Sequence, residues 1–87
     1  MANIKSSAKR AQIAQVRTKR NAAYKSMMKT AIRRFDSTLK AEDIAAAKDE
    51  LRNATRMIDK VKTKGVIHKN TANRRKSRLA KALNRVS

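Results

Sequence analysis

Residues 64–79 combine side chains that suit phosphate and ribose with small apolar side chains at helical spacing. The segment contains the only glycine and the only histidine of the chain, Gly65 and His68. Beyond His68 the pattern predicts a helix with apolar residues on one face. Its other face has cations for phosphate, and amide and hydroxyl groups that also suit the ribose 2′-hydroxyl. This candidate surface for a nucleic-acid backbone consists of Asn70, Asn73, Arg74, Ser77, Arg78 and Lys81.

The distribution of charge predicts a second basic surface near the N-terminus. The net charge is +18 over 87 residues. Residues 1–35 contain ten Lys or Arg and no Asp or Glu, and residues 60–87 contain the same number of bases without an acid. Salt bridges within either segment therefore cannot compensate this charge, whereas an external polyanion can. The candidate contacts in the first segment include Arg17, Lys19, Arg20, Lys25, Lys29 and Arg33.

The composition argues against an enzyme or a metalloprotein. The chain has no cysteine, one histidine and six carboxylates, and every carboxylate lies in residues 36–59. This set forms no catalytic triad or metal site at any usual spacing, and no glycine-rich loop is present to bind a nucleotide cofactor. We expect no catalytic residue, no metal and no cofactor. The sequence also has no secretory signal and no apolar run of membrane-spanning length, which favours a cytoplasmic protein without membrane contact.

The hydrophobic pattern predicts an all-α fold in a single domain over residues 1–87. Three helices are expected, over about 7–39, 43–63 and 68–85, as an up-down-up bundle. Ser6 or Ser7 would cap the first helix and Asp43 the second, while Gly65 would end the second. The predicted core stripes are Tyr24, Met28, Ala31, Ile32, Phe35 and Leu39; Ile44, Ala47, Leu51, Ala54, Ile58 and Val61; and Ala72, Leu79, Leu83 and Val86. Arg75 and Lys76 would lie beside the third stripe.

The first helix is expected to extend beyond the bundle. Its core stripe, continued towards the N-terminus at 3.6 residues per turn, reaches Asn21, Arg17 and Arg10. About four turns, or ~20 Å, should therefore have no apolar face and lie on a negatively charged partner. A frayed, solvated N-terminus is the alternative.

Two points stay open from the residues alone. His68 could pack or cap at the start of the third helix, or it could contact a phosphate or a base. The scarcity of aromatic residues argues against a single-strand stacking surface and favours docking on folded nucleic acid, without deciding between RNA and DNA. A nucleoid-type DNA-compacting protein is the main alternative, although no lysine-rich repeat is present. A membrane-surface helix would need larger apolar residues.

Three stretches of the sequence form a recognisable set. They are Ala-Asn-Ile-Lys-Ser-Ser-Ala-Lys-Arg at 2–10, residues 26–30 and, most specifically, Gly-Val-Ile-His-Lys-Asn at 65–70, followed by Ala72, Arg74, Lys76, Ser77 and Leu79. In their order and spacing these stretches resemble the bacterial ribosomal protein S20 family. The likeness covers the whole chain.

The resemblance implies a three-helix bundle that binds 16S rRNA directly and stabilises it early in assembly of the small ribosomal subunit. It implies contacts with the 5′ domain of the 16S rRNA and with its penultimate stem near the 3′ end. Other components of the small ribosomal subunit are implied as further partners. The free protein is expected to be a monomer. The RNA-binding positions that the resemblance implies are Lys5, Ser6, Lys9, Arg10, His68, Lys69, Asn70, Arg74, Lys76, Ser77 and Arg78.

Overall fold

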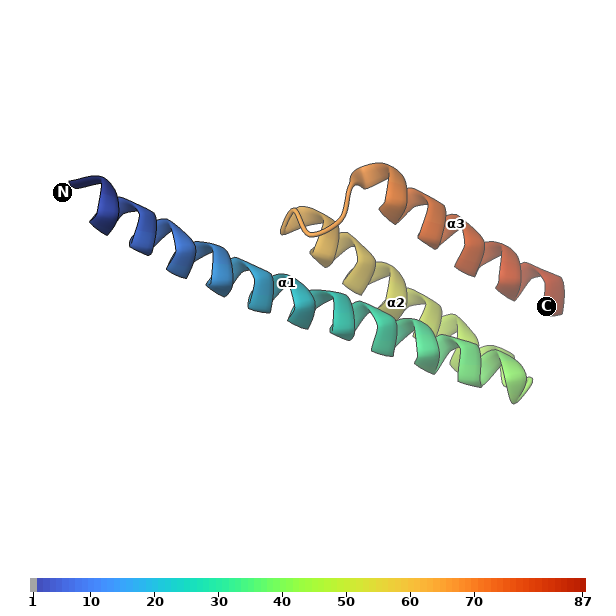
Figure 1. Ribbon diagram of the computed structural model, residues 1–87. Helices are drawn as coiled ribbons and strands as arrows, with labels where there is room; N and C mark the ends of the chain where they lie inside the picture. Colours follow the sequence, from blue (N-terminus) through green and yellow to red (C-terminus); the bar gives the residue numbers. More distant parts are fainter. Residues whose placement is uncertain (1) are drawn as a thin grey trace.

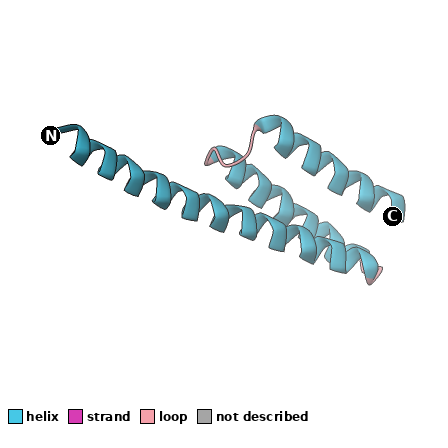
Figure 2. Cartoon of the chain, viewed as in Figure 1, coloured by secondary structure: helices cyan, strands magenta, loops and turns pink. Residues whose placement is uncertain are grey.

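The described part of the chain forms three helices in an up-down-up arrangement, as predicted. The computed structural model describes the backbone of residues 2–87 and the side chains of residues 7–87. Helix α1 is Ala2–Lys40, α2 is Ile44–Thr63 and α3 is Lys69–Val86 (Figure 1). Two short loops connect them, and over the described residues the fold is entirely helical (Figure 2).

Helix α2 is the element that both other helices pack against. Helix α1 packs on α2 and α2 packs on α3, whereas α1 and α3 barely touch. The molecule is elongated, with extents of 64 × 21 × 13 Å. Its radius of gyration is 17.6 Å, compared with about 12 Å for a compact domain of this length. Much of the length comes from α1, whose N-terminal part continues past the end of α2 (Figure 1).

The core is built from the three predicted stripes. Its buried members are Met28, Phe35, Ala47, Ala54, Ile58, Val61, Ala72, Leu79 and Leu83. Tyr24, Ala31, Ile32, Leu39, Ile44 and Leu51 pack against them as partly buried residues. The prediction was wrong for Val86, which is 48% exposed. Val86 is the last residue of α3, so no following turn covers it.

The N-terminal part of α1 extends beyond the bundle, as predicted. Every residue from 7 to 20 is exposed, and Asn21 is the first that is half-buried. We call residues 7–20 the arm. Two expectations about it were wrong. The helix begins at Ala2, so Ser6 and Ser7 lie within it and do not cap it. The arm also has apolar side chains, since Ile13 is 43% and Val16 is 66% exposed.

Both α1 and α2 end in the same backbone motif, in which two crossed hydrogen bonds satisfy the last carbonyl groups. At the end of α2, the Gly65 amide donates to the Lys62 carbonyl (2.9 Å) and the Val66 amide to the Val61 carbonyl (3.1 Å). At the end of α1, the Glu42 amide donates to the Leu39 carbonyl and the Asp43 amide to the Thr38 carbonyl. This is the Schellman motif, and it requires a left-handed residue at its turn. Gly65 has φ +76° and Glu42 has φ 59°.

Helices α2 and α3 both begin at a side-chain cap. Asp43 accepts a hydrogen bond from the Ala46 amide at 3.1 Å, as predicted. His68 caps α3 through Nδ1, which accepts from the Asn70 amide at 3.1 Å. Capping by His68 was one of the two roles left open from the sequence. Since Nδ1 accepts, the ring proton of the neutral imidazole is on Nε2, and that nitrogen stays available to another partner.

Glu42→Gly should stabilise the fold even though it removes a side chain. A left-handed backbone costs a residue with a Cβ about 1–2 kcal/mol, and the greater freedom of glycine in the unfolded chain offsets part of the gain. We expect a net increase of up to about 1 kcal/mol in the free energy of unfolding, measured by urea denaturation. Glu42→Ala is the charge-matched control, because it removes the carboxylate and keeps the strain. Equal stability of the two variants would contradict this explanation.

Amide exchange in the free protein should divide the chain at Asn21. Every described side chain of the arm is exposed, and an isolated helical segment of this length is marginal in water. Amides of residues 7–18 should therefore exchange far faster than those of residues 47–61, whose side chains include much of the core. Hydrogen exchange followed by NMR measures this difference. Protection of the arm as strong as that of α2 would contradict it.

Candidate nucleic-acid interface

The predicted basic residues of α1 lie on the surface without an acidic partner. Lys9, Arg10, Arg17, Lys19, Arg20, Lys25, Lys29 and Arg33 are all exposed. Within residues 7–87, none of them forms an ion pair with a carboxylate. The side chains of Lys5 and Ser6 lie outside the described residues. The exposed cations of α1 therefore extend from the arm along the bundle.

The predicted face of α3 is also exposed. Lys69, Asn70, Asn73, Arg74, Ser77, Arg78 and Lys81 are accessible, while Ala72, Leu79 and Leu83 of the same helix are buried. Packing on α2 thus fixes which face of α3 points outward. The structure does not merge the basic surfaces of α1 and α3 into one patch, because these helices barely touch. It places them on either side of α2.

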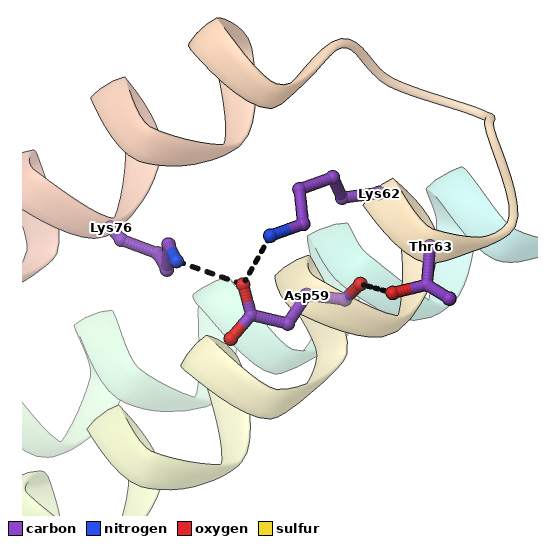
Figure 3. Close-up of polar contacts among 4 residues, drawn as sticks. All are labelled: Asp59, Lys62, Thr63 and Lys76. Atoms are coloured by element: carbon purple, nitrogen blue, oxygen red, sulfur yellow. Dashed lines mark hydrogen bonds and ion pairs between the residues drawn. The ribbon is translucent and has the colours of Figure 1, made fainter.

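Lys76 differs from the other predicted contacts, because an interhelical ion pair engages it. Its Nζ donates to Oδ1 of Asp59 at 2.8 Å, from α3 to α2 (Figure 3). Lys62 reaches the same oxygen at 3.6 Å. The Lys76 side chain is 28% exposed. Part of its charge is therefore compensated inside the protein, unlike the charge of Arg74 or Arg78.

The same contact stabilises the ionised form of Asp59. The hydrogen bond from Lys76 is the main cause that lowers the pKa of Asp59 below 3.8, and the charges of Lys76 and Lys62 add to it. Partial desolvation of the carboxyl opposes this effect and raises the pKa. The Asp59 side chain is 43% exposed, so solvent screens the pair and its contribution to stability is modest.

The acidic residues concentrate away from the arm. Three of them surround the turn between α1 and α2, at the opposite end of the long axis from the N-terminus (Figure 1). Two more lie in the first half of α2. In order, these residues are Asp36, Glu42, Asp43, Asp49 and Glu50. The long axis of the molecule is therefore also an axis of charge, and a polyanion is attracted most strongly towards the arm.

Sequence reasoning missed three residues of these surfaces. Ile13 and Val16 form an apolar pair between exposed cations, and their spacing of three residues was the only signal. Arg75 is half-buried, and its Nε is enclosed without a hydrogen-bond partner among the described atoms. The sequence predicted that Arg75 would lie beside the apolar stripe but gave no sign of this enclosure.

The described residues contain neither a cluster of metal-ligating side chains nor a membrane-spanning helix. In that part of the chain, no three His, Asp or Glu side chains gather where they could hold a metal ion. Nor is any of the three helices, over the same residues, long and apolar enough to cross a membrane.

Asp59→Asn should lower stability at neutral pH and remove one source of acid sensitivity. Because the folded-state pKa is below 3.8, the carboxylate stabilises the fold fully above that pH, and its contribution is lost as pH falls through the folded-state value. The difference between parent and variant in urea denaturation should therefore shrink below pH 3.8. Sucrose can keep the parent folded there. Asp49→Asn is the control, since its pair with Arg52 at 3.9 Å is largely exposed; the same pH dependence in that variant would contradict the assignment.

Comparisons with known proteins agree on one family. A sequence profile described as ribosomal protein S20 matches residues 2–84. The small ribosomal subunit protein bS20 of Pelotomaculum thermopropionicum is 53% identical over 87 residues, which cover all of this chain and 99% of that protein. The protein of the same name from Desulfitobacterium hafniense is 56% identical over 81 residues, 93% of this chain and 89% of the relative. The resemblance predicted from the motifs is thus confirmed, and the chain belongs to the ribosomal protein S20 family.

Proposed function

We propose that this protein is a structural constituent of the small ribosomal subunit that binds 16S rRNA directly and stabilises its folded form during assembly. The observation that carries the proposal is the row of exposed cations on α1 and α3, without acidic partners among the described side chains. The relatives named above are small-subunit ribosomal proteins. In this function the protein acts by binding, and it has no catalytic step.

Rigid helices suit the recognition of folded RNA through its backbone. Arg74 and Arg78 offer planar guanidinium groups to phosphates, and Asn70, Asn73 and Ser77 offer amides and a hydroxyl to the ribose 2′-hydroxyl. His68 can add a hydrogen bond through Nε2 while Nδ1 keeps its role as the cap of α3. These groups project from one helix whose orientation the core fixes, so little backbone freedom is lost on binding.

Placement of the two basic surfaces on either side of α2 suits a protein that joins two RNA segments. We propose that α1 and α3 contact different parts of 16S rRNA, the 5′ domain and the penultimate stem near its 3′ end. Each contact neutralises phosphate charge where two RNA helices approach each other. The bundle then holds both segments at a fixed separation. Its acidic turn would point away from the RNA, because a carboxylate next to phosphate is unfavourable.

A pair of triple variants tests whether α3 docks on RNA or only supplies positive charge. The first replaces Arg74, Arg78 and Lys81 on α3 with Gln. The second replaces Arg52, Arg56 and Lys60 on α2 with Gln. All six residues are exposed, and each set removes three charges without touching the core. Affinity for a folded small-subunit rRNA fragment is measured over a range of salt concentrations.

Only the α3 variant should lose affinity substantially. Its log–log salt slope should become shallower by about two to three units, at ~0.7–0.9 per phosphate contact removed. The α2 variant should keep nearly the parental slope, because salt screens charges beyond a Debye length of ~8 Å. Equal losses in the two variants would exclude the proposed face and favour unspecific binding, as in DNA compaction.

A further inference from the structure

Two β-branched residues on the arm face solvent although they are large and apolar. Ile13 is 43% and Val16 is 66% exposed. Single apolar residues on a surface need no explanation, but neighbouring ones often mark an interaction site. These two are three residues apart and therefore lie side by side on one face of α1. No part of the bundle covers them, because the arm from residue 7 to 20 is exposed throughout.

Polar side chains surround this pair on all sides. Lys9 and Arg17 lie one helical turn before and one turn after Ile13. Gln12 and Arg20 lie one turn before and one turn after Val16. The six side chains border a shallow, open depression, and most of the surface that lines it is apolar. Three of the four surrounding residues are cations, and residues 7–35 contain no acid. The surface is thus an apolar strip between positive charges.

From this arrangement we infer that Ile13 and Val16 pack against the ribose face of an rRNA minor groove while Lys9, Arg17 and Arg20 bind the phosphates on both sides. The inference rests on the proposed function and assigns a contact within it. Charge decides the occupant, because an RNA groove presents carbon-rich riboses between two rows of phosphate. The minor groove of A-form RNA is wide and shallow enough for such a contact. A neighbouring protein would have to supply an acidic rim around an apolar patch.

The contact has a signature that separates it from charge attraction. Log affinity falls linearly with log salt, and the slope reports the phosphates neutralised. The affinity extrapolated to 1 M salt, where counterion release no longer contributes, reports the remaining contacts. A combined Ile13→Ala and Val16→Ala variant should therefore bind a protein-free 16S rRNA fragment roughly tenfold more weakly at every salt concentration, from the apolar area lost. Its salt slope should equal that of the parent.

The cationic neighbours should behave in the opposite way. A combined Arg17→Gln and Arg20→Gln variant should have a slope shallower by about 1.4–1.8 units, with a small change in affinity at 1 M salt. Loss of arm helicity cannot explain the effect of the alanine variant, because alanine favours a helix more than isoleucine or valine does. Circular dichroism of the free and bound proteins checks this point.

Added charge gives the sharpest comparison. Ile13→Lys with Val16→Lys adds two cations at the apolar strip, and Gln15→Lys with Thr18→Lys adds two at the same spacing on the opposite, exposed face. The first variant should bind rRNA more weakly than the parent despite its extra charge, whereas the second should bind equally well or more tightly. Equal tightening by both variants, or weakening by both, overturns the inference.

Two further outcomes are distinct. If the alanine variant binds protein-free rRNA like the parent but enters small ribosomal particles poorly, the strip contacts a neighbouring protein and the inference fails. If the parent itself does not bind the rRNA fragment more tightly than unrelated RNA, the proposed function fails as well.

Discussion

The fold has to hold two strongly basic helices together although their charges repel each other. Helix α2 solves this because it carries a buried apolar stripe for both neighbours and leaves α1 and α3 almost without contact. It also contains Asp59, whose carboxylate forms an ion pair with Lys76 of α3. A direct α1–α3 interface would bring unpaired cations together in a small domain with little stability to lose. The open, elongated shape follows from this constraint.

Regular features of the sequence were enough to predict the helices and most of the core. Each helix has one stripe of apolar residues at spacings of three and four, and these stripes include the buried residues Phe35, Ile58 and Leu79. Gly65 was recognisable as the end of α2 because glycine adopts the left-handed backbone without strain. Asp43 was recognisable as the start of α2 because its carboxylate can accept a hydrogen bond from a free amide of the first turn. The end of α1 was less visible, since Glu42 takes the left-handed conformation that glycine usually takes. The short link to α2 imposes that conformation, and residue type does not reveal it.

The basic surfaces were predictable as a charge pattern, whereas the state of individual residues was not. Lys76 and Arg74 look equivalent in the sequence, yet Lys76 meets a carboxylate 17 positions away and Arg74 remains free within the described residues. Only packing brings Asp59 opposite Lys76. Ile13 and Val16 were overlooked for another reason: two apolar residues do not make a periodic stripe.

The arm has a consequence for protein turnover. Residues 7–20 are a helix that nothing in the bundle covers, and they include several lysines and arginines. Proteases cut exposed segments that open easily, and those with trypsin-like specificity cut after basic residues. In the function proposed above, RNA bound to the arm would cover these bonds, whereas the free protein presents them to the solvent. The feature that extends the reach of a 9.8 kDa protein is therefore also the part of the free chain that a protease reaches most easily.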